Sequence, residues 1–321
     1  MKKLLVYVCF VFLGISSFCQ PCKADDADVD KTNTKEKSPV LLGDPFILLD
    51  NGTYYAYGTH ASGGIEVYTS TNLKKWKLHG LALNKDDVWA DRRFWAPEVY
   101  KINGKFYMYY SADEHICVAT SDSPLGPFKQ VEQKPMIADE KCIDNSLFID
   151  DNGKPYLFFV RFNDGNNVWV AELESDLATI KKETMHPCIH VSQEWEKVWP
   201  RVNEGPFVIK HKGLYYMSYS ANSYESPLYG VGCATASNIM GTWTKYDNNP
   251  LLQSPGDLVG VGHNAMFTDK EGRLRIVYHA HKDKNNIHPR AMYIGYVTFE
   301  KSGGVDKMKI SKDYISPELV Q

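Results

Sequence analysis

The sequence repeats one pattern five times, and this repeat constrains the fold more than any other feature. Each copy consists of an apolar strand, a polar turn with glycine and a strand rich in aromatic residues, as in DPFILLDNGTYYAY over residues 44–57. Glycine in such a turn adopts the positive φ that a tight hairpin demands. The turn glycines are 49 to 60 residues apart: Gly52, Gly104, Gly153, Gly213 and Gly272.

Repeats of this length with β character are typical of propeller blades. A third strand follows each hairpin, as at residues 65–70, and a short outer strand then carries Trp76, Phe128 or Trp243. Helical periodicity is almost absent, and we interpret even residues 175–183 as a turn followed by a strand. The sequence therefore predicts an all-β fold, a single-domain five-bladed β-propeller with four antiparallel strands per blade.

The first 24 residues have the layout of a secretion signal. Lys2 and Lys3 give a positive start, residues 4–15 are almost wholly apolar, and small residues precede a cleavage site after Ala24. The apolar stretch is too short to cross a bilayer. We therefore expect a signal peptide over residues 1–24 and export to the periplasm or the exterior.

The rest of the chain divides into two parts. Residues 25–39 are charged and lack apolar periodicity, so we expect a flexible tether there and the catalytic propeller over residues 40–321. Lipid attachment at Cys19 or Cys22 is the less favoured alternative to free export, because a bulky residue or a proline precedes each of them.

The net charge and the cysteine spacing each argue against one class of binding partner. The 321 residues carry 36 Lys and Arg against 39 Asp and Glu, a formal net charge of −3, which argues against a nucleic-acid partner. The cysteines of the propeller have spacings that fit no zinc knuckle. The sequence does not decide whether these cysteines form disulfides or are buried free thiols. It also leaves the oligomeric state open. These cysteines are Cys117, Cys142, Cys188 and Cys233.

Three of the five repeats open with a carboxylate, namely Asp44, Asp144 and Glu204. The innermost strand of each blade lines the central channel, so we expect these side chains to converge at one end of the propeller. Burying an unpaired charge costs several kcal/mol, and convergent carboxylates therefore indicate acid–base chemistry. Glycoside hydrolysis uses one carboxylic acid to protonate the leaving oxygen and one carboxylate to activate water.

Five ordered motifs across about residues 40–299 resemble glycoside hydrolase family 43. The resemblance implies that Asp44 is the general base, that Glu204 is the general acid, and that Asp144 orients the acid and raises its pKa. It also implies an inverting displacement, with acid and base about 6.5 to 9.5 Å apart. The motifs are Gly43-Asp44-Pro45, Trp95-Ala96-Pro97-Glu98, Ile143-Asp144, Asn203-Glu204-Gly205-Pro206 and Gly262-His263-Asn264.

The resemblance suggests further residues around the carboxylates. His263 is expected beneath the active site in a central structural role, or in contact with a single structural cation such as calcium, although the chemistry requires no cofactor. Arg290 is expected to bind substrate hydroxyls or the acid. Trp95 is the expected platform for a sugar ring, with Phe207 as a weaker candidate. Glu98 is interpreted as a residue that supports the site from behind the carboxylates or that starts a strand, and not as a catalytic group.

The resulting prediction is a secreted, inverting glycoside hydrolase that acts on plant-cell-wall polysaccharide or oligosaccharide. The resemblance implies the reaction class but leaves the sugar open, because members of the family share a core and differ in their rim loops. An α-L-arabinofuranosidase is the preferred interpretation. The alternatives are a β-xylosidase, an endo-acting arabinanase or xylanase-type enzyme, and an exo-galactanase. A catalytically silent glycan-binding propeller is the alternative from another class.

Overall fold

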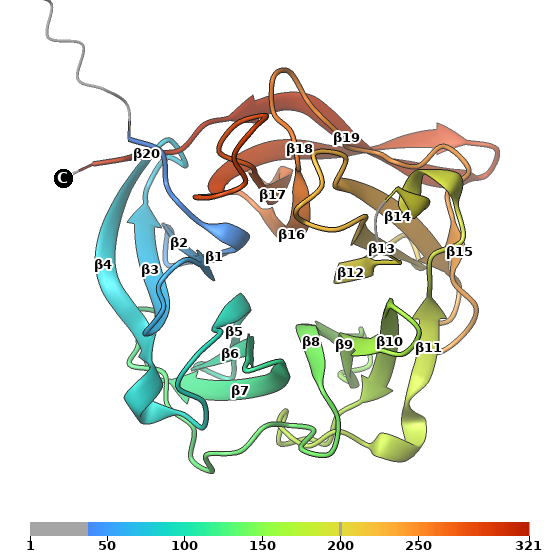
Figure 1. The fold of residues 1–321 in the computed structure, drawn as a ribbon. Coiled ribbons are helices and arrows are strands. Elements are labelled where there is room, and N and C mark those ends of the chain that lie inside the picture. The colour runs from blue at the N-terminus through green and yellow to red at the C-terminus, as the bar shows by residue number, and fades with distance from the viewer. Residues whose placement is uncertain (1–37, 199–200, 321) are drawn as a thin grey trace, which may run out of the picture. The chain divides into compact units, whose positions relative to one another are not determined.

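The computed structural model describes residues 38–198 and 201–320. The predicted signal peptide and all of the predicted tether except Ser38 and Pro39 lie outside the described residues. The described chain forms five antiparallel sheets around a common axis, with the first strand of each sheet at the centre (Figure 1). This confirms the prediction of an all-β, five-bladed propeller.

The strands follow one another from the centre of each blade to its edge. The first blade contains β1 (Gly43–Asp50), β2 (Thr53–Thr59), β3 (Gly64–Ser70) and β4 (Lys75–Asn84). The second contains β5 (Trp95–Ile102), β6 (Lys105–Ala112) and β7 (His115–Ser121). The third contains β8 (Cys142–Ile149), β9 (Pro155–Phe162), β10 (Asn166–Glu172) and β11 (His186–Ile189).

The last two blades repeat this order. The fourth contains β12 (Asn203–His211), β13 (Leu214–Ala221), β14 (Gly230–Ala236) and β15 (Thr244–Lys245). The fifth contains β16 (Gly262–Thr268), β17 (Leu274–Ala280), β18 (Ala291–Ser302) and β19 (Val305–Ile315). Three short 3-10 helices connect strands: η1 (Lys85–Asp87), η2 (Lys182–Thr184) and η3 (Glu194–Lys197).

The outer edge of two blades is less regular than the repeat suggests. In the second blade the fourth position is held by a single antiparallel bridge between Thr120 and Lys129, next to the buried ring of Phe128. In the third blade, Ile180 forms an isolated bridge with Leu173, and β11 begins only after η2. Where a turn and a strand were predicted at residues 175–183, the structure has a turn, one bridge and the start of η2.

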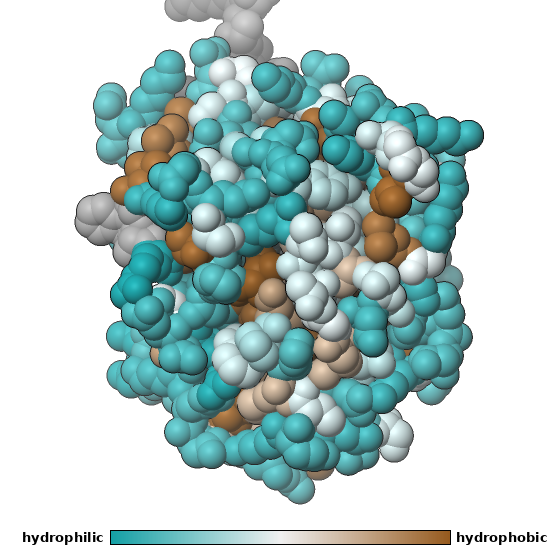
Figure 2. Space-filling model, turned by 90° about the vertical axis from the view of Figure 1, so that its right-hand side faces the viewer, coloured by the Kyte–Doolittle hydropathy of each residue, from teal (hydrophilic) through white to brown (hydrophobic). Residues whose placement is uncertain are grey.

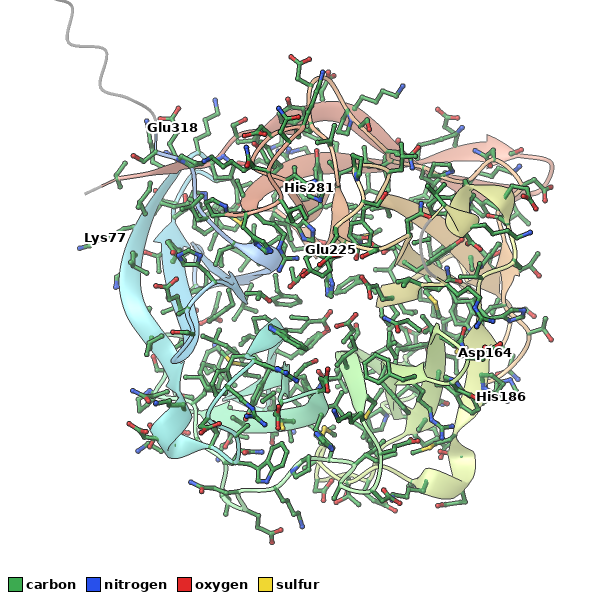
Figure 3. The ribbon with its side chains drawn as sticks, viewed as in Figure 1. Lys77, Asp164, His186, Glu225, His281 and Glu318 are labelled. Carbon is green, nitrogen blue, oxygen red and sulfur yellow. The ribbon has the colours of Figure 1, made fainter. Side chains whose placement is uncertain are left out.

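The two ends of the described chain meet at the first blade. β20 (Glu318–Leu319) adds a parallel strand to the outer edge of β4, and Leu319 N–H donates to the carbonyl of Ser38 at 2.7 Å. The carbonyl of Val40 accepts a hydrogen bond from Met292 N–H of the fifth blade at 3.0 Å. Figure 3 shows Glu318 at this outer edge. These contacts close the ring between its last and first blades.

Aromatic side chains fill the interfaces between blades. Phe158 and Trp243 pack edge to face across the third and fourth blades at 5.8 Å, and Tyr54 and Phe267 do so across the fifth and first at 6.1 Å. Such pairs fill the wedge between twisted sheets and bury a large apolar area. The outer face that carries β11 and β15 is mostly hydrophilic, with scattered apolar residues (Figure 2).

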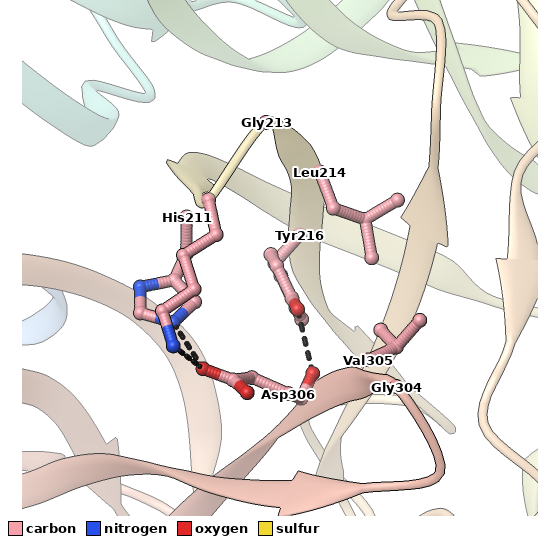
Figure 4. Close-up of a pocket in the computed structure, with 8 residues that line it drawn as sticks. His211, Gly213, Leu214, Tyr216, Gly304, Val305 and Asp306 are labelled. Atoms are coloured by element: carbon pink, nitrogen blue, oxygen red, sulfur yellow. Dashed lines mark hydrogen bonds and ion pairs between the residues drawn. The ribbon is translucent and has the colours of Figure 1, made fainter.

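One interface also holds a polar contact. His211 Nε2 lies 2.8 Å from Asp306 Oδ2, while its ring stacks on Phe299 at 3.8 Å between centroids. His211 and Asp306 border a cavity of about 300 Å³ between the fourth and fifth blades (Figure 4). The cavity lies at the turn end of β12, so it belongs to the packing of the blades.

The four cysteines of the propeller are free thiols, and Cys117, Cys142 and Cys233 are buried. Of the two alternatives that the sequence leaves open, the structure has the free thiols. Over residues 38–198 and 201–320, no helix is long and apolar enough to cross a membrane.

Candidate active site

The inner strand of every blade opens with a β-bulge, and the residue at each bulge has a left-handed backbone conformation. The pairing register shifts across this residue in all five sheets. Asp and His adopt this conformation more readily than most residues, and bulges re-aim side chains near functional sites. The bulge residues have φ between 46° and 59°: Asp44, Ala96, Asp144, Gly205 and His263.

The backbone N–H of each bulge residue donates to a side chain of the preceding blade. In four blades the acceptor occupies an equivalent place, opposite the residue that comes just before the preceding blade's own bulge. The four acceptor atoms lie 2.7 to 3.1 Å from the amide nitrogens: Thr59 Oγ1, Ser111 Oγ, Ser220 Oγ and His279 Nδ1.

The interface between the third and fourth blades breaks this pattern. The equivalent place is taken by Val160, which pairs with Ile143 and has no polar group. The amide of Gly205 instead donates to Asp144 Oδ2 at 3.1 Å. Because Val160 has no hydroxyl group to accept it, the backbone N–H of Gly205 is available to the carboxylate of Asp144.

Asp44 is held by the fifth blade. Arg290 binds both of its oxygens, at 2.6 Å from Nη1 to Oδ1 and 3.0 Å from Nη2 to Oδ2, while His279 Nδ1 accepts its backbone N–H. Burial acts to raise the pKa of Asp44, but Arg290 and two nearby histidines outweigh it and hold that pKa well below its usual value. Asp44 is therefore ionised at neutral pH, as a general base must be.

Glu204 stands one residue before its bulge and has different neighbours. Tyr229 Oη donates to Oε1 at 2.8 Å, and Asn166 Nδ2 donates to Oε2 at 3.0 Å. Burial raises the pKa of Glu204 to about 7, although both hydrogen bonds act in the opposite direction. A carboxyl group with this pKa holds a proton over much of the range in which Asp44 is ionised.

Asp144 completes the set of carboxylates. It is 7% exposed, close to the 8% of Asp44 and of Glu204. Burial, and then repulsion from Glu204 and Asp44, raise the pKa of Asp144 well above its usual value. Three carboxyl groups that repel one another in this way cannot all ionise at neutral pH, so at least one proton is retained among them.

His263 lies beside the carboxylates. Its Nδ1 is 3.4 Å from Asp44 Oδ1 and 4.0 Å from Asp144 Oδ2, and burial lowers its pKa. Calcium takes six to eight oxygen ligands. The described residues contain no group of three or more His, Cys, Asp or Glu that could hold a metal ion, and the guanidinium of Arg290 would repel a cation here. A contact between His263 and a structural cation stays a prediction.

Two expected substrate contacts lie in different surroundings. Trp95 is half-buried at the start of β5, in the place equivalent to that of Glu204 in β12. Phe207 is two residues past its bulge, is 8% exposed and packs against Phe46 at 6.4 Å. The structure thus places Phe207 in a packed layer of the channel, and its contact with substrate stays a prediction.

Glu98 occupies the same channel layer as Phe207. It accepts a hydrogen bond from Tyr100 Oη, and burial raises its pKa to about 8. Glu98 is therefore largely neutral at pH 7. Its position two residues past the bulge fits the interpretation as a strand-start residue.

Three residues of the site were missed by the sequence interpretation: Asn166, Tyr229 and His279. Asn166 begins β10, Tyr229 ends a loop before β14, and His279 lies in β17, so none of them opens a hairpin. The sequence signal is that His279 stands where three of the other four blades carry a serine or threonine. Arg290 was expected to bind the acid or the substrate, and the structure pairs it with Asp44.

Comparisons with known proteins find similar chains among glycoside-cleaving enzymes. A crystal structure of an endo-1,4-beta-xylanase from Bacteroides thetaiotaomicron is 46% identical and superposes with a TM-score of 0.85, covering 89% of this chain and 99% of its own. A beta-D-galactofuranosidase from Aspergillus niger is 26% identical over 276 residues, 77% of each protein. An extracellular exo-alpha-(1->5)-L-arabinofuranosidase from Cellvibrio japonicus is 23% identical over 286 residues, 77% of this chain and 81% of that protein.

The family match covers most of the described chain. The sequence profile described as glycosyl hydrolases family 43 matches residues 37–305, which include all five bulges and all three carboxylates. The chain therefore belongs to glycoside hydrolase family 43.

Proposed function

We propose that this protein hydrolyses glycosidic bonds by an inverting mechanism in which Glu204 is the general acid and Asp44 the general base. The contrast between their surroundings carries the proposal. Arg290 keeps Asp44 ionised, whereas burial keeps a proton on Glu204. A pair of carboxyl groups whose pKa values are driven apart is the arrangement that acid–base hydrolysis uses.

The reaction is a single displacement. Asp44 accepts a proton from a water molecule as the water oxygen bonds to the anomeric carbon. The bond from that carbon to the leaving oxygen breaks, and Glu204 gives its proton to that oxygen. Asp144 and Glu204 repel each other when both are ionised, so we propose that Asp144 opposes loss of the second of the two protons and helps to orient the acid. Trp95 is the proposed platform for the sugar ring.

The proposed substrate is a plant-cell-wall polysaccharide or oligosaccharide, and the preferred activity is that of an α-L-arabinofuranosidase. The similarity to an exo-acting arabinofuranosidase over 77% of this chain supports this choice. A xylan-directed activity is the second candidate, because the 46% identical crystal structure is described as an endo-1,4-beta-xylanase. Export after cleavage near Ala24 remains part of the proposal, supported by the layout of the first 24 residues.

The first test compares release of nitrophenol from aryl α-L-arabinofuranoside and aryl β-D-xyloside, with Asp44→Asn as the blank. Release by the wild type and not by the variant supports the assignment of Asp44 and shows which sugar is preferred. If neither aryl glycoside reacts, reducing ends released from arabinan and xylan are measured. No release from any of these substrates, together with retained binding, would favour the silent glycan-binding propeller.

Two further measurements test the mechanism. Proton NMR of the first sugar formed shows its anomeric configuration, and retention of configuration would contradict the inverting displacement. Glu204→Gln should slow substrates with poor leaving groups far more than activated aryl glycosides, because only the former depend strongly on protonation. Equal losses on both kinds of substrate would exclude Glu204 as the acid.

A further inference from the structure

Tyr229 lies at the end of the loop between β13 and β14. Its side chain is fully buried, while Glu225 of the same loop is exposed and projects near the central opening (Figure 3). The loop is fixed at both ends. Asn222 Nδ2 donates to the carbonyl of Leu228 at 2.9 Å, and His281 Nε2 lies 2.6 Å from the carbonyl of Tyr224.

The hydroxyl of Tyr229 is directed at Glu204 alone. It donates to Oε1 at 2.8 Å, and burial raises its own pKa well above the usual value, so the hydroxyl keeps its proton. Asn166 donates to the other oxygen. Each oxygen of Glu204 therefore has one neutral donor, and the plane of its carboxyl group is fixed by two contacts.

The ring of Tyr229 is held by the neighbours of Asp44. It stacks on His279 with 5.7 Å between centroids and 16° between planes. A Cβ atom on Gly262 would lie 2.2 Å from its Cε1, so the ring rests against a backbone that only glycine leaves open. Since His279 also accepts the N–H of Asp44, Tyr229 connects the surroundings of the two carboxylates.

We propose that Tyr229, together with Asn166, is a positioning residue for Glu204 that fixes the direction of its carboxyl group and the pH at which it loses its proton. This inference rests on the proposed function, in which Glu204 is the acid. Hydrogen bonds from neutral donors favour an ionised carboxylate. Burial pushes the carboxyl group towards the neutral form, and the two donors limit that effect.

The other charged and titratable groups around Glu204 come from four strands and from the loop before β18, and all of them remain in Tyr229→Phe. Each of these groups acts on Glu204 in both the wild type and the variant. A difference in pH profile between the two proteins is therefore due to loss of the Tyr229 hydroxyl. These groups are Asp44 on β1, Asp144 on β8, His263 on β16, His279 on β17 and Arg290 before β18.

The test is the pH profile of kcat/KM for Tyr229→Phe. The basic limb, which reports loss of the proton from Glu204, should move up by about one pH unit, because a hydrogen bond to the ionised form is lost. The rate on substrates with poor leaving groups should fall about tenfold at the optimum, and the rate on activated aryl glycosides should fall less. In a Glu204→Gln background the second substitution should have no further effect on activated substrates.

Tyr216→Phe is the matched control. Tyr216 lies on the same blade, is 1% exposed, and donates its hydroxyl to the carbonyl of Asp306 at 2.6 Å, away from the carboxylates. The basic limb of this variant should stay at the wild-type pH. An equal shift in both variants, or none in Tyr229→Phe, would overturn the inference.

Asn166→Ala covers the case in which Tyr229→Phe does not fold. Asn166 is only half-buried, on a hairpin, and its loss should also raise the basic limb. An unmoved limb in Asn166→Ala would overturn the inference. A wild type without glycosidase activity would instead remove the proposed function, and an active wild type with unmoved variants would remove only this inference.

Discussion

Arg290 binds both carboxylate oxygens of Asp44, with N–O distances of 2.6 and 3.0 Å. A bidentate pair of this kind fixes the plane of the carboxylate as well as its charge. The proposed base is thus oriented by the last blade although it lies on the first strand. The proposed mechanism therefore depends on a residue of the fifth blade.

Arg290→Lys should move the acidic limb of the pH profile to higher pH. Lysine offers a point charge in place of the planar fork, so it holds one oxygen at best. Arg290 lowers the pKa of Asp44, and weakening the pair raises that pKa, so the base is lost to protonation at a higher pH than in the wild type. The measurement is kcat/KM against pH, and an acidic limb that stays in place would contradict this role.

Asp144→Asn should move the basic limb to lower pH. Asp144 and Glu204 repel each other when both are ionised, which raises the pH at which the second proton of the pair is lost. With asparagine at position 144, Glu204 ionises without this repulsion. The acid then loses its proton at a lower pH than in the wild type. A variant with the wild-type pH profile and the wild-type rate would show that Asp144 has only a structural role in its turn.

Val160→Thr should lower kcat about tenfold, the effect of one misdirected hydrogen bond of about 1.4 kcal/mol. The introduced hydroxyl stands where Ser111 and Ser220 stand in other blades, and it competes with Asp144 for the amide of Gly205. Val170→Thr, at another fully buried site in the same core, is the control. Equal loss of activity in both variants would show that a buried hydroxyl alone causes the effect.

Lys245→Met should lower the free energy of unfolding by about 3 to 5 kcal/mol. Lys245 Nζ lies 2.6 Å from the fully buried Glu196 and 2.7 Å from Asn203, the residue before the proposed acid. The variant leaves the charge of Glu196 buried without its partner. Urea denaturation measures the change.

Lys134→Met is the control for this stability prediction. Lys134 pairs with Glu132 on the surface, where both side chains are mostly exposed, so its loss should change stability by at most about 0.5 kcal/mol. A change below about 1 kcal/mol in Lys245→Met would mean that Glu196 is neutralised or hydrated after the substitution.

The turn glycines predict the five blades correctly because a hairpin is a local structure. Gly52 and its four counterparts specify positive φ whatever the rest of the chain does. The outer edge is harder to predict, since strand formation there depends on contacts between blades. At Lys129 a single bridge is all that forms.

The convergence of Asp44 and Asp144 follows from their equivalent places in the repeat. The partners of Glu204 do not follow from the sequence, because Tyr229 and Asn166 are 25 and 38 residues away from it and come from loops or strand ends. The pairing of Arg290 with Asp44 spans 246 residues. The contacts of Asn166 and Arg290 depend on how neighbouring blades pack, and the contact of Tyr229 depends on the conformation of the loop before β14. No local sequence pattern predicts either. Secretion and the sugar specificity remain predictions.

The chain of amide contacts between neighbouring blades has a topological consequence. Each bulge residue is tied to the blade before it, and Asp44 is tied to the fifth blade in the same manner as the others. In the layer of the carboxylates, the hydrogen bonds between blades therefore form a closed ring in which no blade is first or last. Residues 38 and 319 already share a hydrogen bond, so a circular permutant of the propeller opened at the Gly303–Gly304 turn would keep all five ties.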